Sequence, residues 1–194
     1  MREIILLAGP SGSGKSHLSR FPGVTRFRLD DFYLDETAPG LPRLPHGVID
    51  WDDPRTWDGA EARDALIELT NTGSAQVPDY DIATSSRIGM HELTAPDNAV
   101  IVAEGIFAPE MAALLSEAGV AVRPIWMHRS RIGNFRRRLK RDLAEKRKPV
   151  PVLLRRGIAL SRQETAFRKR ALAAGFEPLS MKDGRRLLTS LLSR

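Results

Sequence analysis

The chain has 194 residues, no cysteine and a formal net charge of +6. This length suits one α/β core and is too short for two domains of ordinary size, so we expect a single domain over residues 1–194. The lack of cysteine excludes disulfides, thiolate metal sites and a cysteine nucleophile. The apolar run at 4–8 is far too short for a membrane span or a signal-peptide core, so we expect a cytoplasmic protein with no membrane partner.

The positive charge is concentrated in one segment. Residues 123–170 hold 17 Lys and Arg against three Asp and Glu, whereas the rest of the chain holds 13 against 21. Such a segment fits a solvated helix face, a surface that binds nucleic acid or a cationic lid over a polyphosphate, and composition alone does not choose between them.

Short apolar runs alternate with helical patterns along the chain. The predicted strands are residues 3–8, 24–29, 99–103 and 120–127, with an extended stretch at 75–83. The predicted helices begin at Lys15 and cover about 54–70, 110–118, 129–148, 162–173 and 184–192. Between them, residues 37–58 form a flap that begins with a stretch rich in Pro and Gly. This alternation predicts a mostly parallel sheet with helices on both faces and ligands at the carboxyl ends of the strands.

Residues 9–16 read Gly-Pro-Ser-Gly-Ser-Gly-Lys-Ser between the first predicted strand and a predicted helix. In this pattern, small residues let backbone N–H groups converge on phosphate oxygens at a helix N-terminus. We expect Lys15 to reach the β- and γ-phosphates of ATP and the Ser16 hydroxyl to hold Mg²⁺. The residues predicted to surround the nucleotide are Gly9, Ser11, Gly12, Ser13, Gly14, Lys15, Ser16 and His17. The alternative is a glycine-rich turn with a chance lysine, which the flanking strand and helix disfavour.

Acidic side chains follow two other predicted strands. Asp30 and Asp31 come directly after residues 24–29, at the same edge of the sheet as the P-loop, and Glu104 ends the run 99–103. A carboxylate at Asp30 or Asp31 can accept the proton of an attacking hydroxyl or hold a water of Mg²⁺, and the carboxylate of Glu104 can face the metal. The alternatives are solvated turn residues and an acid at a helix N-terminus.

The helix predicted at 129–148 has one apolar stripe, and its other faces are mostly Arg and Lys. Arginine supplies planar, permanently charged donors for the negative charge of phosphoryl transfer. We expect about two or three of these cations to reach phosphates while the others face water, with the helix acting as a mobile lid. Trp51 and Trp57 flank the acidic stretch 50–58 and either line a base or sugar pocket or pack a short helix on the sheet.

Five elements in a fixed order make the chain resemble the uridine/cytidine kinases, within the P-loop small-molecule kinases. They are GPSGSGKS at 9–16, DDFY at 30–33, WDDPRTWD at 51–58, PDYDIATSSR at 78–87, and EGI at 104–106 followed by RRLKRD at 137–142. The resemblance covers residue 4 to about residue 148. The chain departs from the family pattern at Asp53, Ile82 and Ser85, and after Pro149 the pattern is absent.

The resemblance implies roles at the phosphate side of the site. Asp30 corresponds to the catalytic base, and Ser16 and Glu104 correspond to the residues on the metal side. Together with the P-loop motif, this gives Lys15 and Asp30 as the expected catalytic residues outside the lid.

The resemblance also implies roles at the acceptor side and in the lid. Asp52 corresponds to the acid that holds the ribose hydroxyls, and Tyr80 and Arg87 correspond to positions that line the nucleoside pocket. Arg138 and Arg141 correspond to lid arginines that contact substrate or phosphates. We expect Arg138 to bind substrate and Arg141 to act in catalysis.

The sequence therefore predicts an α/β P-loop kinase fold with a five-stranded, mostly parallel sheet, a basic lid at 129–148 and a substrate-side flap at 37–58. The predicted activity is Mg-ATP-dependent phosphorylation of a small-molecule hydroxyl, with the 5′-hydroxyl of uridine or cytidine in first place. The alternatives are a kinase of another small alcohol, such as a sugar or a pantothenate-like compound, and a P-loop protein that binds nucleic acid. The acidic half of the chain and Asp30 favour the kinase, and a homo-oligomer stays open.

Overall fold

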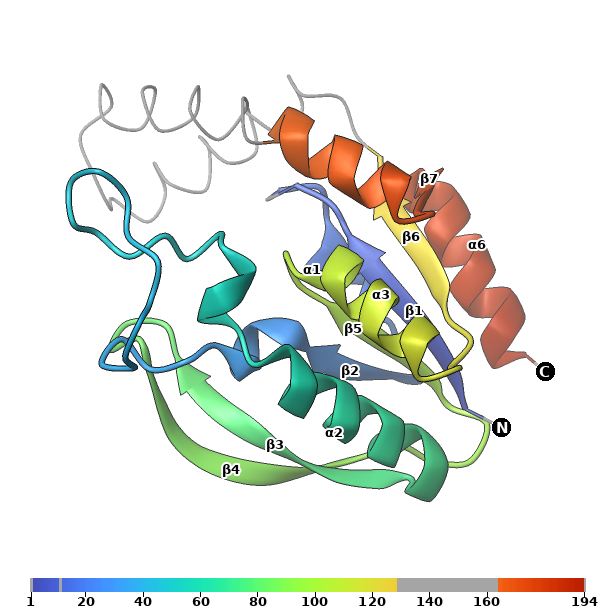
Figure 1. The fold of residues 1–194 in the computed structure, drawn as a ribbon. Coiled ribbons are helices and arrows are strands. Elements are labelled where there is room, and N and C mark those ends of the chain that lie inside the picture. The colour runs from blue at the N-terminus through green and yellow to red at the C-terminus, as the bar shows by residue number, and fades with distance from the viewer. Residues whose placement is uncertain (1, 11, 129–163, 194) are drawn as a thin grey trace.

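The computed structural model describes residues 2–10, 12–128 and 164–193. Its main sheet consists of β1 (Glu3–Ala8), β2 (Val24–Arg28), β5 (Val100–Glu104), β6 (Arg123–Met127) and β7 (Glu177–Leu179). The strand order is β2-β5-β1-β6-β7, and every neighbouring pair is parallel (Figure 1). The prediction of a five-stranded, mostly parallel sheet is confirmed.

The register brings the carboxyl ends of the central strands to one edge of the sheet. Leu7 of β1 and Arg28 of β2 both pair with Glu104 at the end of β5. Because these parallel strands end together, the segments that follow them begin close to one another. The P-loop after β1, Asp30 after β2 and Gly105 after β5 therefore share this edge.

Helices cover both faces of the sheet, because alternate residues of a buried strand point to opposite sides. They are α1 (Lys15–Leu18), α2 (Gly59–Thr72), α3 (Ala108–Glu117), α6 (Met181–Leu192) and a helix at residues 164–173 (Figure 1). Ile4 and Leu6 of β1 belong to the core that includes α2, α3 and the helix at 164–173. Ile5 and Leu7 belong to a second core with α1 and α6.

The chain segment between β2 and β5 forms a smaller substructure beside the main sheet. It contains the 3₁₀ turns η1 (Leu29–Phe32) and η2 (Pro54–Thr56) and an antiparallel hairpin of β3 (Ser74–Asp81) and β4 (Ser86–Thr94). Strand β4 was not expected from the sequence, because it is exposed along most of its length and carries no continuous apolar run. Strand β7 was not expected either, because it is only three residues long.

The helix expected to begin at Pro54 is two separate elements. Trp57 is extended between η2 and α2, and its indole Nε1 donates to the carbonyl of Leu29 at 2.9 Å. Asp58 then caps α2, since its carboxylate accepts the N–H of Glu61 at 2.9 Å. The buried indole and the new cap start α2 several residues later than the sequence pattern suggests.

Within the described part of the chain, no helix is long and apolar enough to cross a membrane. The predicted lid at 129–148 lies outside the described residues. The organisation as one domain with a flap at 37–58 stays a prediction.

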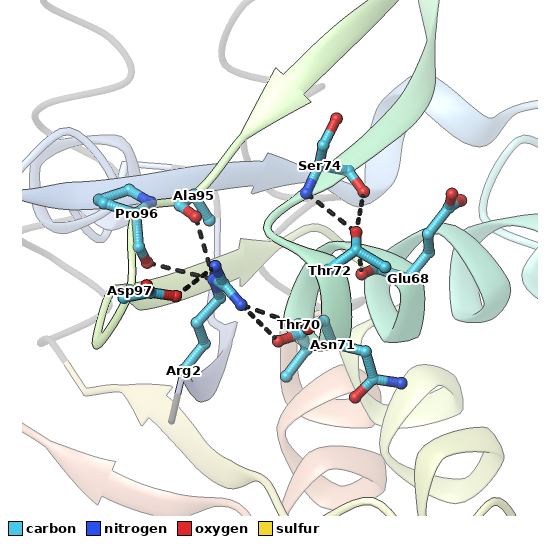
Figure 2. A network of polar contacts seen from close by, with 9 residues as sticks. All are labelled: Arg2, Glu68, Thr70, Asn71, Thr72, Ser74, Ala95, Pro96 and Asp97. Atoms are coloured by element: carbon cyan, nitrogen blue, oxygen red, sulfur yellow. Dashed lines mark hydrogen bonds and ion pairs between the residues drawn. The ribbon is translucent and has the colours of Figure 1, made fainter.

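Arg2 joins three segments at the amino-terminal edge of the sheet. Its guanidinium donates to the carbonyls of Thr70 (3.1 Å), Asn71 (3.5 Å), Ala95 (3.0 Å) and Pro96 (3.1 Å) (Figure 2). It also pairs with Asp97 at 2.8 Å. The first two carbonyls belong to the last turn of α2, where helical carbonyls lack donors within the helix. Arg2 therefore closes the end of α2 and ties it to β1 and to the loop before β5.

We expect Arg2→Ala to lower the free energy of unfolding by about 1–3 kcal/mol, because several partly buried carbonyls lose a charged donor. Urea denaturation measures this difference. Arg63→Ala is the matched control: it removes an arginine of α2 that, within the described residues, pairs only with its neighbour Asp64, and it should change stability by less than about 0.5 kcal/mol. Equal stability of Arg2→Ala and the wild type would mean that the network contributes nothing.

Candidate active site

The P-loop leaves β1 and enters α1 along a glycine-dependent path. Gly9, Gly12 and Gly14 all have positive φ angles, of 151°, 80° and 99°. A Cβ on Gly9 would lie 2.9 Å from the Cβ of Met127 and 3.0 Å from the hydroxyl of Ser13, so no larger residue fits there. The absence of a side chain at Gly9 therefore lets the loop pack closely against Met127 at the end of β6. The predicted contact Ser11 lies outside the described residues.

Lys15 folds back onto this loop. Its Nζ donates to the carbonyl of Gly9 at 2.5 Å and to that of Pro10 at 3.3 Å, which holds the ammonium at the mouth of the loop. Ser16 and His17 are exposed, and His17 contacts Arg185 of α6. When a phosphate binds in the loop, the Lys15 ammonium can therefore donate to phosphate oxygens in place of these carbonyls.

Asp30 is a half-buried acid in η1, directly after β2. Its Oδ1 is fully buried, and among the described residues no hydrogen-bond donor reaches that oxygen. Burial raises the pKa of Asp30 above its ordinary value, while the nearby Lys15 ammonium acts in the opposite direction. A Cβ on Gly105 would lie 2.8 Å from Oδ1, so the glycine after β5 is required for the carboxyl to sit there. Such an acid is prepared to accept a proton.

Asp31 has a different environment. Burial raises its pKa to about 6, with Arg28 opposing the shift from 3.1 Å. Asp31 is not among the residues that line the cavity described below, whereas Asp30 is. The geometry therefore separates two acids that the sequence places side by side.

Glu104 ends β5 with only 6% of its surface exposed. Its Oε1 accepts the hydroxyl of Ser19 at 2.8 Å and two donors of the Arg26 guanidinium, at 2.8 Å from Nε and 2.5 Å from Nη2. The acid lies on the same cavity as Lys15 and Ser16. Glu104 and Ser16 thus line the same cavity, where they could bind a cation that accompanies a nucleotide.

One cavity of about 900 Å³ joins these groups. Its lining includes P-loop residues, Asp30, Glu104, the flap residues 49–52 and part of the helix at 164–173. Several of its lining side chains were not predicted as site residues from the sequence, among them Arg26, Arg28, Phe167 and Arg170. For Arg26 and Arg28, a local signal is their alternation with Phe27 along the predicted strand, which places both arginines on one face.

The predicted acceptor residues separate into two groups. Asp52 lines the cavity, and burial together with the neighbouring Asp50 raises its pKa. Tyr80 and Arg87 do not line it: the Tyr80 hydroxyl donates to the carbonyl of Leu34 at 3.2 Å, and Arg87 pairs with Glu61 at 2.5 Å. The roles of all three residues stay predictions.

The two tryptophans have different positions. Trp51 lines the cavity, whereas Trp57 is buried and stacks on Phe107 with ring centroids 5.1 Å apart. The interpretation as a packing residue thus fits Trp57, and a role of Trp51 in a base or sugar pocket stays a prediction. The predicted lid arginines Arg138 and Arg141 lie outside the described residues.

Sequence comparisons give relatives of two kinds. No protein family model matches the chain. It is 30% identical over 113 residues to the uridine kinase of Ureaplasma parvum serovar 3 (strain ATCC 700970), a match covering 54% of this chain and 53% of that protein. It is 36% identical over 112 residues to inorganic pyrophosphatase TTM1 of Arabidopsis thaliana, covering 54% of this chain and 16% of that protein. The chain thus spans about half or less of the length of these relatives.

The fold also has a solved counterpart. A protein from Silicibacter sp. TM1040, provisionally named a fructose transport system kinase, superimposes with a TM-score of 0.62 over 92% of this chain and 88% of its own, at 20% identity. The chain thus resembles uridine kinases over about half of its length and has a P-loop kinase fold. The expected resemblance and fold class are confirmed.

We expect Asp31→Asn to stabilise the protein at about pH 8 by about 1–3 kcal/mol, at about 1.4 kcal/mol per pKa unit. The folded-state pKa of about 6 lies above the ordinary aspartate value of 3.8, so folding favours the protonated acid. The ionised form therefore lowers stability above about pH 6, and this loss disappears as the pH falls toward 4. Asparagine resembles the neutral acid. Urea denaturation across this pH range should show the two proteins converging at low pH, and a constant difference would contradict the assignment.

Proposed function

We propose that this protein transfers the γ-phosphoryl group of Mg-ATP to a hydroxyl of a small polyhydroxylated acceptor, with the 5′-hydroxyl of uridine or cytidine as the leading candidate. The observation that carries the proposal is the buried, unpartnered Oδ1 of Asp30 on the same cavity as Lys15. A P-loop that only bound nucleotide would have no use for a desolvated acid beside the phosphates.

The residues present fit ATP and its cation. The P-loop backbone forms a cradle in which a side chain on Gly9 would collide, and Lys15 is already turned toward the loop carbonyls. Ser16 and Glu104 would hold Mg²⁺, which would supply positive charge to neutralise the phosphates. In this arrangement the Lys15 ammonium leaves the carbonyls of Gly9 and Pro10 for the β- and γ-phosphate oxygens.

Asp30 supports a proton-accepting role. As the acceptor oxygen bonds to the γ-phosphorus and the bond to ADP breaks, the hydroxyl proton passes to the Asp30 carboxylate. A desolvated carboxylate with a raised pKa holds that proton better than a solvated one, and the nearby Lys15 ammonium opposes this rise in pKa.

The acceptor side of the cavity has the composition of a sugar site. Trp51 and Phe167 supply aromatic surface, and Asp50 and Asp52 supply carboxylates that can accept hydrogen bonds from hydroxyl groups. Ribose and free sugars both present such hydroxyls. The names of the relatives, a uridine kinase and a protein provisionally named as a kinase of fructose transport, point to the same class of acceptor.

A screen of ADP release tests the proposal. Purified protein with Mg-ATP is offered uridine, cytidine, fructose and other sugars, glycerate and pantothenate, and inorganic pyrophosphate is tested as a hydrolysis substrate. We expect release with a nucleoside or sugar, and none with Lys15→Ala, whose fold is held by the backbone. Pyrophosphate hydrolysis without any acceptor-dependent release would overturn the kinase proposal.

We expect Asp30→Asn to lower kcat by about 10²–10⁴-fold with little change in ATP affinity, because the amide keeps the shape of the carboxyl but cannot take the proton. Steady-state kinetics with the best acceptor and calorimetry with ATP measure the two quantities. Asp31→Asn is the matched control and should be much milder, since Asp31 does not line the cavity. A larger loss of kcat in Asp31→Asn than in Asp30→Asn would mean that Asp30 is not the base.

A further inference from the structure

Glu104 is neutralised by a cation of the protein itself. Only 8% of its side chain is exposed, and within the described residues all its hydrogen-bond donors meet one oxygen, Oε1. Two of the three donors belong to the Arg26 guanidinium, whose own side chain is 27% exposed. An acid so buried needs a positive partner even before any metal arrives, because an unpaired buried charge is costly.

The position of Arg26 explains how it reaches this acid. Arg26 and Arg28 occupy alternate positions of β2, so both side chains project from one face of the strand, and both line the cavity. Arg28 pairs with Asp31, whereas Arg26 crosses to β5 and pairs with Glu104. The two arginines therefore have the same strand, face and charge, but only one neutralises the metal-side acid.

A second acid makes this neutralisation more important. Asp30 lies close enough to Glu104 for the two negative charges to interact, and both carboxyls face the same cavity. Without a cation between the strands, the carboxyl edge would hold two buried like charges. A divalent cation could relieve this repulsion, and in its absence the guanidinium of Arg26 does so.

We propose that Arg26 is a stand-in cation: its guanidinium neutralises Glu104 until the divalent cation of ATP arrives, and so keeps free divalent cations from binding there alone. The inference rests on the proposed function, since the cation concerned is the one that accompanies ATP. The phosphates of ATP add negative charge, and this charge offsets the repulsion between Arg26 and a divalent cation. Cation and nucleotide therefore bind together rather than in sequence.

The test is Mn²⁺ binding to the nucleotide-free protein, followed by electron paramagnetic resonance of the free ion. Arg26→Gln keeps a donor for Oε1 but removes the charge, and it should bind Mn²⁺ about tenfold or more tightly than the wild type. Arg26→Lys keeps the charge and should behave as the wild type. Arg28→Met is the matched control and should not gain affinity. Equal Mn²⁺ affinity of Arg26→Gln and the wild type would overturn the proposal, as would an equal gain in Arg28→Met.

Thermal unfolding gives a second measurement. Arg26→Met should unfold at a lower temperature than the wild type in a chelator, and millimolar Mg²⁺ should restore more of the melting temperature in the variant than it adds to the wild type. If Arg26→Met folds only with Mg²⁺, the ion has replaced the guanidinium, which supports the proposal. If it folds in neither condition, the cation cannot replace the arginine and the proposal is wrong. These measurements need no phosphoryl transfer, so a protein inactive toward every acceptor would still decide them.

Discussion

The burial of negative charge where β2 and β5 end is the constraint on which the site depends. Asp31 and Glu104 are buried, as is the Oδ1 atom of the half-buried Asp30, and ionised carboxylates in such a place are costly unless cations face them. Arg26 and Arg28 meet two of these acids, and the third is left with the P-loop lysine nearby. Asp30, the acid proposed as the base, is therefore the one of the three acids that no arginine of β2 pairs with in the described residues.

Aromatic packing fixes the flap relative to this edge. Tyr33, three residues after Asp30, donates its hydroxyl to the carbonyl of Trp51 at 3.1 Å and packs against that indole with ring centroids 5.5 Å apart. It also contacts Phe107, on which Trp57 stacks. The flap residue Trp51, which lines the cavity, is therefore held by the same chain segment that carries the proposed base.

What the sequence could predict follows from the range of the interactions. Strands β1 and β5 were predicted because a run of buried apolar residues is a local signal, and the P-loop and Asp30 because each motif is contiguous beside a strand end. Strand β4 was missed because its residues are stabilised by pairing with β3 rather than by their own pattern. The pairing of Arg26 with Glu104 joins residues 78 positions apart, and no local pattern specifies such a partner.

The uneven charge of the chain becomes complementary across the cavity. The acidic part of the sequence supplies Asp50 and Asp52 on the flap, and the end of the basic segment supplies Arg170, which also lines the cavity. Arg170 is held by Glu110 at 3.3 Å and lies over the Phe167 ring, so its guanidinium is oriented before any ligand binds. Its charge lowers the pKa of Asp52, against the effect of burial and of Asp50. One cation of the basic segment, whose excess charge composition could attribute to nucleic acid binding, thus opposes the rise in pKa of an acid on the flap.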